Sequence, residues 1–319
     1  MNRYAYNIRR IIGRRIAYMR GPSYKDKYYS SIYSVFMHWC EDIRGLSNDI
    51  SIKKSEEFIE NIEGKHDIVI PRVVISITDY CTLRCKECAA AIPYLKDRVC
   101  SDTEMVIKDI EKLLSNVDEM ICIEFIGGEP LLHPELDKLI HYACKNDKIR
   151  MVELTTNATI LPDKKLVDEL KDDKVIIQIS NYKNEVQKID EFKELCSLNE
   201  IKLKILDMEK WYSYGNPIKK NRSRSELKYS YYYCNDSSMC RTVYDGKLFV
   251  CGRAAALYAM GKQIDDSSYL DIRNIELTGE TIKKFFMEKQ WANACDFCDA
   301  SRDFLKVVAV AEQVDNKFN

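Results

Sequence analysis

The segment CTLRCKEC at residues 81–88 contains three cysteines, Cys81, Cys85 and Cys88, in the spacing Cys-x3-Cys-x2-Cys. A loop of this length can wrap all three thiolates around one metal centre. Three thiolates are one fewer than the set that closes a structural zinc site, and one fewer than the set that fully ligates a 4Fe-4S cluster. One coordination position is therefore left for a small molecule, and this opening would make the site reactive.

A second short motif that could take part in chemistry is Gly127-Gly128-Glu129-Pro130. The two glycines let the backbone approach a ligand closely, and the carboxylate that follows can accept hydrogen bonds from an ammonium group. An ordinary turn would use the same residues. Other polar side chains come at the ends of later predicted strands; they are Thr155, Thr156, Asn157, Ser180 and Asn181.

Five further cysteines lie near the C-terminus; they are Cys234, Cys240, Cys251, Cys295 and Cys298. Gly246 and Cys251 belong to a predicted hairpin, and Cys295 and Cys298 form a Cys-x2-Cys pair. Two sulfurs from a hairpin together with such a pair suit a zinc ribbon as well as an iron-sulfur cluster. The spacing alone therefore leaves the kind of metal open.

The composition is that of a globular chain without a disulfide framework. Of its 319 residues 46% are apolar and 31% charged, enough to bury a core and remain hydrated. Gly13-Arg14-Arg15 splits the N-terminal apolar stretch into pieces too short for a secretory signal, so we expect a cytoplasmic protein. Thirteen cysteines in such a reducing compartment indicate that some of them bind a metal. The scattered cysteines are expected to be small buried hydrophobes; they are Cys40, Cys100, Cys122, Cys144 and Cys196.

The charge and the N-terminus exclude some classes of partner. A formal charge of −1 provides no global positive field for a nucleic-acid backbone, so no nucleic-acid partner is expected. No apolar run reaches the roughly 18 residues that cross a bilayer, so no transmembrane segment is expected. Apolar residues between Tyr4 and Met19 recur at helical spacing. The arginines among them either contact an anionic surface or partner, or are solvated while the helix packs on the main domain.

Short apolar runs alternate with amphipathic segments after residue 72, a pattern typical of parallel βαβ units. Strands are predicted at residues 72–77, 120–126, 151–154, 175–180 and 201–206, and helices at residues 101–116, 134–146, 163–170 and 185–196. Ser101 and Glu104 are expected to form a capping box, and Pro134 to open the second helix. In such folds the chemistry lies at the C-terminal ends of the strands.

After residue 207 this alternation stops. The aromatic run Tyr229–Tyr233 is predicted to be a packed hairpin that follows a basic, solvated loop. Asp245-Gly246 is a strong signal for a tight turn between short strands within residues 243–250. A small cysteine-bearing module is therefore expected after the α/β domain.

The cysteine triplet after the first strand and the Gly-Gly-Glu-Pro motif after the second together resemble the radical S-adenosylmethionine (radical SAM) superfamily, over about residues 72–207. The resemblance implies an α/β fold, a partial (β/α)6 barrel. It implies that Cys81, Cys85 and Cys88 ligate three irons of a 4Fe-4S cluster, whose fourth iron binds S-adenosylmethionine. One departure is Glu87, because the family commonly has an aromatic residue here, beside the adenine.

The same resemblance assigns the remaining cofactor contacts. In the family the Gly-Gly-Glu motif receives the ammonium group of the methionyl part. The positions that match cofactor-binding positions of the family are Gly127, Gly128, Glu129, Pro130, Thr155, Asn157, Ser180 and Asn181.

The downstream cysteines look like the auxiliary-cluster modules of this family called SPASM domains and, in shortened form, twitch domains. This likeness implies one auxiliary 4Fe-4S cluster, with Cys240 as the rival of Cys234 for one ligand position. The implied ligands are Cys234, Cys251, Cys295 and Cys298. The expected domains are a basic, tyrosine-rich helical extension (1–70), the radical SAM barrel (71–232) and a small α+β twitch-like domain with the C-terminal tail (233–319).

The resemblance also implies the chemistry. An electron from a flavodoxin- or ferredoxin-type reductant cleaves S-adenosylmethionine, and the 5'-deoxyadenosyl radical removes hydrogen from an unactivated carbon. With the auxiliary cluster as electron acceptor, the expected reaction is oxidation of a sugar, nucleotide sugar or amino alcohol. Oxidation of a carbinol needs a base, and Glu124, Glu153 and Asp207 are candidates by position.

Three other interpretations remain open. A peptide-modifying maturase could bind its substrate through residues 1–70, and a redox-neutral epimerase or dehydratase would not need the second cluster as an acceptor. A structural or regulatory iron-sulfur or zinc protein would have no turnover and would need no open iron site.

Overall fold

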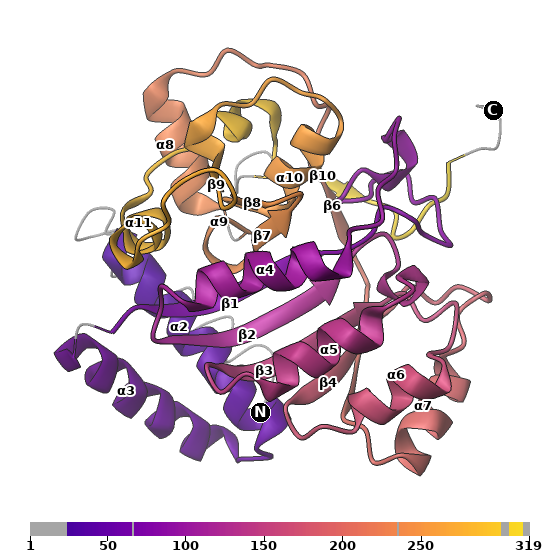
Figure 1. The fold of residues 1–319 in the computed structure, drawn as a ribbon. Helices are drawn as coiled ribbons and strands as arrows, with labels where there is room; N and C mark the ends of the chain where they lie inside the picture. The colour runs from indigo at the N-terminus through magenta and orange to yellow at the C-terminus, as the bar shows by residue number, and fades with distance from the viewer. Residues whose placement is uncertain (1–23, 66, 235, 301–305, 315–319) are drawn as a thin grey trace.

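The computed structural model describes residues 24–65, 67–234, 236–300 and 306–314, which surround an eight-stranded sheet (Figure 1). The strand order is β5-β4-β3-β2-β1-β7-β8-β9. All neighbours from β5 to β7 are parallel, and β8 and β9 continue the sheet antiparallel. The strands are β1 (Val69–Ser76), β2 (Glu119–Ile126), β3 (Ile149–Thr156), β4 (Val175–Asn181), β5 (Leu203–Asp207), β7 (Arg241–Tyr244), β8 (Lys247–Phe249) and β9 (Tyr269–Asp271).

The five predicted parallel strands are confirmed as β1 to β5, and with them the α/β fold class. Six consecutive residues of β2 are buried, because elements cover both faces of the sheet. The chain does not continue the sheet beyond β5. Instead β6 (Trp211–Ser213) pairs with β10 (Lys306–Val308) in a separate antiparallel sheet, and the sixth parallel strand is β7, beside β1. The main sheet therefore runs across residue 233, into the segment expected to form the small domain.

One face of the sheet is covered by four amphipathic helices; they are α4 (Thr103–Leu114), α5 (Leu136–Lys145), α6 (Lys164–Leu170) and α7 (Ile189–Leu198). Figure 1 shows α4 and α5 on the near side of the sheet. The predicted cap of the first helix is wrong by one residue, because Asp102 accepts the hydrogen bond from Met105 N at 2.9 Å. The neighbouring Ser101 instead donates its backbone N–H to Ile77 O. The second helix begins at Leu136, two residues after Pro134.

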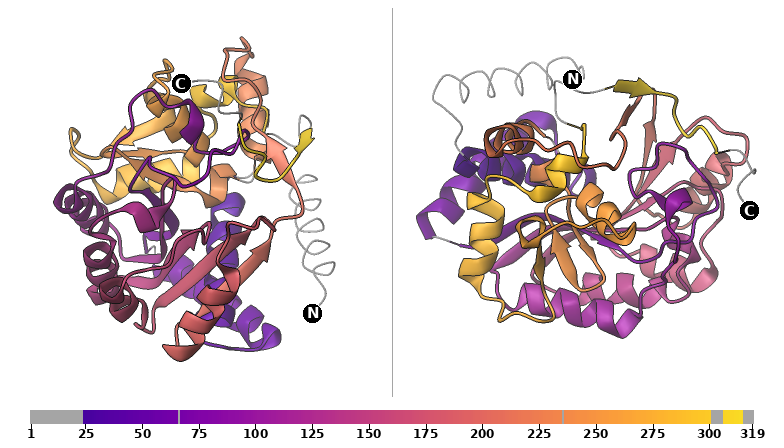
Figure 2. Two further views of the ribbon diagram at one scale, coloured as in Figure 1. Left: turned by 90° about the vertical axis from the view of Figure 1, so that its right-hand side faces the viewer. Right: turned by 90° about the horizontal axis from the view of Figure 1, so that it is seen from above.

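The opposite face of the sheet is covered in part by the N-terminal segment. This segment comprises α2 (Tyr24–His38), the π-helical turn η1 (Trp39–Ile43) and α3 (Asn48–Lys65). Buried α2 side chains pack on Val69, Ile121 and Met151 of the first three strands. The two views in Figure 2 show the same layering. Residues 24–43 therefore belong to the core, while the basic helix expected at the start of the chain lies outside the described residues.

The C-terminal module consists mainly of short elements. Its helices are α8 (Arg224–Tyr233), α9 (Asp236–Met239), α10 (Gly252–Ala259) and α11 (Gly279–Lys283), and its short helical turns are η4 (Asp266–Ser268), η5 (Lys284–Glu288) and η6 (Asn293–Phe297). Two further turns, η2 (Ile92–Tyr94) and η3 (Pro130–Leu132), lie in the barrel part. The predicted Asp245-Gly246 hairpin is confirmed between β7 and β8. The predicted hairpin at Tyr229–Tyr233 is wrong, because a capping box of Ser223 and Glu226 starts a helix there.

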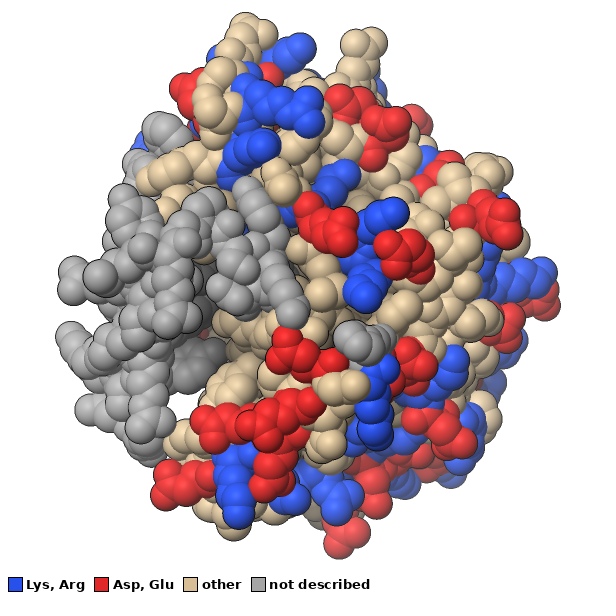
Figure 3. All heavy atoms as spheres, turned by 90° about the vertical axis from the view of Figure 1, so that its left-hand side faces the viewer, with Lys and Arg blue, Asp and Glu red and all other residues tan. Residues whose placement is uncertain are grey.

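The surface gives no sign of a strongly charged face on the side shown in Figure 3, where Lys and Arg side chains are interspersed with Asp and Glu. Within the described ranges, no helix combines the length and the apolar content that spanning a bilayer requires. Of the scattered cysteines, Cys100 is exposed, contrary to expectation, and the other four are buried as expected.

Replacing Ile32 by Ala tests the packing of α2 as part of the core. The Ile32 side chain is fully buried against the sheet, so Ile32→Ala should lower the free energy of unfolding by about 2–5 kcal/mol. Ile50→Ala is the control, since Ile50 in α3 is 48% exposed and its loss should change stability by less than about 0.5 kcal/mol. Urea denaturation followed by circular dichroism measures both; equal effects would show that α2 is not part of the core.

Candidate functional site

The cysteine triplet lies in the loop that follows β1, and its three side chains share one apolar cluster. Their neighbours there include Tyr182 and Trp211, whose rings meet edge to face at a centroid distance of 5.4 Å. These aromatic rings stand beside the triplet, whereas Glu87 accepts a hydrogen bond from Ser213 at 2.9 Å. The structure thus brings the three thiols together in a largely apolar environment.

The C-terminal segment covers this cysteine loop. Lys86 N donates to Glu312 O at 2.7 Å, and Val314 N donates to Arg84 O at 2.9 Å. The side chain of Gln313 donates to Cys85 Sγ at 3.4 Å. Nothing local in the sequence pointed to this role, because Gln313 lies more than 200 residues from the loop.

Two sulfur atoms of the triplet accept hydrogen bonds, Cys85 Sγ from Gln313 and Cys81 Sγ from two donors. Cys81 Sγ accepts from Leu83 N at 3.4 Å and from Asn157 Nδ2 at 3.6 Å. Burial raises the pKa of the Cys81 thiol to about 12, and the nearby Cys88 and Cys85 thiolates add to this shift. Thiolates in such a place need a cation to compensate their charge. The donor set therefore fits the irons of a cluster.

The two glycines of the second motif make room for the cysteine loop. Gly128 N donates to Thr78 O at 2.6 Å, and Glu129 N donates to Tyr80 O at 2.8 Å. A methyl group on Gly128 would lie 2.4 Å from Tyr80 O and 2.7 Å from Cys81 Cβ. Glycine is therefore required here by the close approach of the chain leading into the triplet.

The Glu129 carboxylate joins the ends of β2 and β3. It accepts hydrogen bonds from Thr156 Oγ1 at 2.7 Å, from Asn157 N at 2.8 Å and from Leu131 N at 3.2 Å, where η3 begins at the buried Pro130. A carboxylate has about four acceptor positions, so about one remains for an ammonium group. Burial raises the pKa of Glu129. Its hydrogen bonds in this structure hold the strand ends together.

The other polar residues at the strand ends lie at different distances from the triplet. Asn157 reaches Cys81, as described, and Thr155 points instead to a buried carboxylate, since its hydroxyl donates to Glu124 Oε1 at 2.8 Å. Ser180 is buried at the end of β4, and Asn181 donates to Asp207 Oδ1 at 2.7 Å. Asp207 is exposed at the edge strand β5. It is therefore not grouped with the other two candidate bases.

Those two carboxylates form a buried triad with Arg72 from β1. Arg72 Nη1 donates to Glu124 Oε2 at 2.8 Å, and Nη2 donates to Glu153 Oε2 at 3.1 Å. Within the described part of the chain, Arg72 Nε and Glu153 Oε1 are buried without a hydrogen-bond partner. Burial raises the pKa of Glu153 to about 7; the Arg72 charge opposes this shift, and the Glu124 charge adds to it. The triad can thus bind or release a proton near neutral pH.

The downstream cysteines form a second neighbourhood. Burial raises the pKa of the Cys251 thiol, and so do the negative charges of Cys234, Cys295 and Cys298. Burial is also the main reason why the pKa of Cys298 rises to about 12. Cys240 shares the influence of burial, Asp236 and Cys234 with Cys251, but the Glu124–Arg72 pair also acts on its thiol.

Four thiols withdrawn from water, like the triplet, need a compensating cation, so this donor set also fits a bound metal centre. Arg222 holds the backbone of the Cys-x2-Cys pair in this set, since its Nη1 donates to Cys295 O and to Cys298 O at 2.7 Å each. Among the described residues, no three His, Cys, Asp or Glu side chains converge on one metal-ion position. The thiols of each set are neighbours in this geometry rather than ligands around a single point.

Arg253 lies between the two sets of thiols. Its positive charge acts on both Cys88 and Cys298, lowering their pKa against the larger raising effect of burial. The side chain is 8% exposed, its Nη2 donates to Gly215 O at 3.2 Å, and its guanidinium lies over the Tyr214 ring. In the described part of the chain Nε has no partner. A buried guanidinium with so few bonds can bind an oxygen atom of a ligand.

Gly128→Ala should disturb the triplet without removing any ligand. Because the added methyl group would press on Tyr80 O and Cys81 Cβ, the loop must shift, and we expect iron bound at the triplet to fall by half or more. Gly64→Ala in α3 is the control, since no atom lies within 4 Å of its added methyl group. Iron content after anaerobic reconstitution measures the effect, and an unchanged content in Gly128→Ala would contradict this role.

Comparison with known proteins gives one family and several partial relatives. Residues 75–195 match the Radical SAM superfamily. The chain is 34% identical over 163 residues to a GTP 3',8-cyclase of Clostridium botulinum, covering 49% of this chain and 48% of that protein. A GTP 3',8-cyclase of Clostridium acetobutylicum is 32% identical over 145 residues, which cover 45% and 43%. The chain thus spans about half the length of these relatives.

Some solved structures resemble this chain at low identity and with TM-scores below 0.5. BtrN in complex with AdoMet and 2-DOIA has a TM-score of 0.48 and 15% identity, with 74% of this chain and 98% of that chain covered. Native anSMEcpe with bound AdoMet has a TM-score of 0.48 and 16% identity, with 72% and 83% covered. The family match covers the cysteine triplet, the Gly-Gly-Glu-Pro motif and β2 to β4. Residues 75–195 of this chain therefore form a radical SAM domain.

Proposed function

We propose that this chain is a radical SAM oxidoreductase that uses two 4Fe-4S clusters to oxidise a small polar substrate. The observation that carries the proposal is the presence of two separate groups of partly buried thiols, the triplet in its apolar cluster and the downstream cysteines beside Arg222. In this proposal Cys81, Cys85 and Cys88 hold the cluster that binds S-adenosylmethionine. The ligands of the second cluster are Cys234, Cys251, Cys295 and Cys298.

When bound, these groups supply a 5'-deoxyadenosyl radical from one electron of a flavodoxin- or ferredoxin-type donor, and they take up the electron that the oxidised substrate releases. The chain has to provide the rest. The strand ends around Glu129 and Asn157 would position the cofactor, and Ser180 and Asn181 extend the same edge of the sheet. Exclusion of water by the apolar walls around the triplet protects a reactive intermediate.

The choice of Cys234 over Cys240 as a ligand is supported by charge. Cys234 acts on the thiols of Cys251, Cys295 and Cys298, so it shares their neighbourhood. Burial is the main influence on the Cys240 thiol, and the charges of Glu124 and Arg72 in the barrel interior also act on it. We therefore keep Cys240 outside the ligand set.

A polar substrate is supported by buried groups that have unused bonding capacity. Arg253 makes a single hydrogen bond, to Gly215 O, within the described residues. Arg72 Nε and Glu153 Oε1 are likewise without partners there. Buried polar atoms of this kind are costly unless a ligand or water satisfies them. Hydroxyl and phosphate groups of a sugar or nucleotide sugar would do so, and planar Arg forks suit phosphate particularly well.

Glu153 is the candidate base that we favour. Removing a hydrogen atom and an electron from a carbinol leaves a proton to be taken from its hydroxyl group, and a base with a pKa near the working pH does this best. Glu153 has such a pKa, about 7, and a carboxylate oxygen that is unbonded within the described residues. Asp207 is less suitable, because it is exposed and already accepts a hydrogen bond from Asn181.

The principal alternatives are a nucleotide substrate and a peptide substrate. Relatives named GTP 3',8-cyclase match half of this chain, and Arg253 could bind a phosphate in either case. A peptide bound through residues 1–70 is less well supported, because α2 is packed against the sheet and is not a free docking element. A redox-neutral epimerase or dehydratase would use the same first cluster without passing an electron to the second.

Glu153→Gln tests the shifted carboxyl group. An unfolded Glu has a pKa of about 4.3, and the folded value is about 7, so between these values the folded state binds one proton more than the unfolded state. The free energy of unfolding should therefore decrease as pH rises from about 5 to 7. Glu153→Gln should flatten this decrease, whereas the exposed control Glu57→Gln should keep it. Urea denaturation at several pH values measures the slopes, and an unchanged slope in Glu153→Gln would refute the assignment.

Iron counting and cofactor cleavage test the proposed function itself. Anaerobic reconstitution should give about eight irons per chain, and the triple variant Cys81→Ala/Cys85→Ala/Cys88→Ala about four. With dithionite the parent should form 5'-deoxyadenosine and the triple variant should form none. Cys251→Ala/Cys298→Ala should lose the other four irons and still cleave the cofactor, and Cys100→Ala, at an exposed cysteine, is the control. About four irons together with stoichiometric zinc in the parent would exclude the second cluster.

Hydrogen transfer then identifies the substrate class. Deuterium should pass into 5'-deoxyadenosine from labelled sugars or nucleotide sugars, with GTP and leader-bearing peptides run in parallel. Transfer only from a peptide with its leader would replace the small-molecule proposal, and transfer only from GTP would point to the chemistry of the named relatives.

A further inference from the structure

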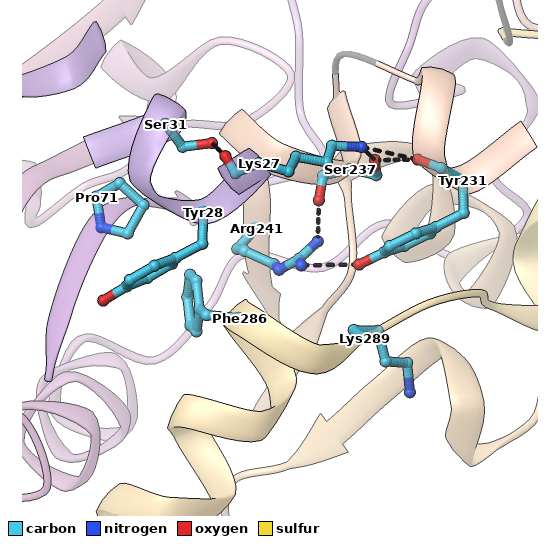
Figure 4. Close-up of a pocket in the computed structure, with 9 residues that line it drawn as sticks. All are labelled: Lys27, Tyr28, Ser31, Pro71, Tyr231, Ser237, Arg241, Phe286 and Lys289. Atoms are coloured by element: carbon cyan, nitrogen blue, oxygen red, sulfur yellow. Dashed lines mark hydrogen bonds between the residues drawn. The ribbon is translucent and has the colours of Figure 1, made fainter. Parts of the chain in front are cut away.

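A small pocket lies where α2, the start of β1 and the C-terminal module meet (Figure 4). Two of its cations, Lys27 and Arg241, are turned toward Tyr231 and Ser237, and Cys234 lies between these two residues in the sequence. Lys27 comes from α2, outside the radical SAM domain, and Arg241 is the first residue of β7. The pocket therefore joins the N-terminal segment to the second set of thiols.

Lys27 binds the backbone just before and at Cys234, and the Ser237 side chain just after it. Its ammonium group lies 2.8 Å from Tyr231 O, 2.9 Å from Tyr232 O and 3.0 Å from Cys234 O. It also lies 2.6 Å from the Ser237 hydroxyl oxygen, and that hydroxyl lies 2.6 Å from Tyr231 O. The Lys27 ammonium group thus holds the end of α8 and the start of α9, the two helices on either side of Cys234, close together.

Arg241 extends the same arrangement to Cys251. Its Nη1 donates to Ser237 O and to Val250 O, the carbonyl that immediately precedes Cys251, and its Nη2 donates to the Tyr231 hydroxyl at 2.8 Å. The side chain is buried. The two cations together hold the backbone at two of the four proposed ligands of the second cluster.

The Lys27 charge lies close to the proposed cluster ligand, because its ammonium group is 3.0 Å from the backbone oxygen of Cys234 itself. A thiolate, or a cluster bound by thiolates, carries negative charge, and one more electron increases it. A nearby, half-buried cation therefore favours the reduced form of the cluster, because net charge is one of the factors that set cluster potentials.

We propose that Lys27, supported by Arg241, is a positioning residue of the second cluster, which holds the Cys234 segment and makes the cluster easier to reduce. This inference rests on the proposed function, since it requires a cluster at Cys234, Cys251, Cys295 and Cys298. It gives α2 a role in electron transfer: an N-terminal helix outside the family domain adjusts how readily the substrate-derived electron is accepted.

Three variants separate the hydrogen bonds of Lys27 from its charge. Lys27→Gln keeps donor groups without the charge, Lys27→Met removes both, and Lys27→Arg keeps both. Lys289→Met is the matched control, because Lys289 lines the same pocket but lies over the Phe285 ring and donates no hydrogen bond to the described residues around Cys234. Iron content and an anaerobic redox titration followed by electron paramagnetic resonance are measured for each.

We expect the midpoint potential of the second cluster to become more negative in Lys27→Gln and Lys27→Met, and to stay near the parent value in Lys27→Arg and Lys289→Met. The signal of the first cluster and its response to S-adenosylmethionine should not change in any variant. Loss of about four irons in Lys27→Met alone would support the holding role, and Lys27→Gln and Lys27→Arg would then supply the potentials.

Two results would overturn the inference. The first is a parental iron content and potential in both Lys27→Met and Lys27→Gln. The second is an equal shift in Lys27→Gln and Lys27→Arg, which would make side-chain shape responsible instead of charge. Failure of the proposed function is distinguishable, because the parent protein would then contain no second cluster to titrate.

Discussion

The arrangement of this molecule depends on one electrostatic constraint, that a thiolate withdrawn from water must lie beside positive charge. Burial raises the pKa of Cys81, Cys251 and Cys298, and in each case neighbouring negative charges add to the effect. The protein's own cations compensate only in part, through Arg253 at one of these thiols and Lys27 at Cys234. The remaining negative charge is what a cluster of irons would neutralise, so binding of the metal and stability of these loops are coupled.

The parallel sheet meets this constraint by bringing separate segments to one edge. The triplet follows β1, the Gly-Gly-Glu-Pro motif follows β2, and Asn157 follows β3. The backbone hydrogen bonds of Gly128 and the carboxylate of Glu129 then join these three strand ends, so a change in any of them moves the cysteine loop. This is why a motif read as cofactor-binding also has an architectural role.

Local patterns predicted what depends on local physics. The periodicity of buried residues located β1 to β5, and cysteine spacing located the thiol groups, because both are properties of short segments. Predictions failed where two local signals competed, as with Ser101 beside Asp102, or where a cap overrode aromatic β-propensity, as in Tyr229–Tyr233. Contacts across the whole chain, such as Gln313 with Cys85, had no local signal.

The sheet face that α2 covers in part also carries the triad, and this arrangement bears on where a substrate can bind. Along β1 to β3 this face begins with apolar residues that α2 covers, continues with the triad of Arg72, Glu124 and Glu153, and ends near the cysteine loop. Because α2 occupies the N-terminal part of this face, we expect a substrate of the proposed reaction to approach the triad from the cysteine side. A carbon held there would lie between the proposed source of the radical and the proposed base, so hydrogen abstraction and proton removal could act on the same end of the substrate.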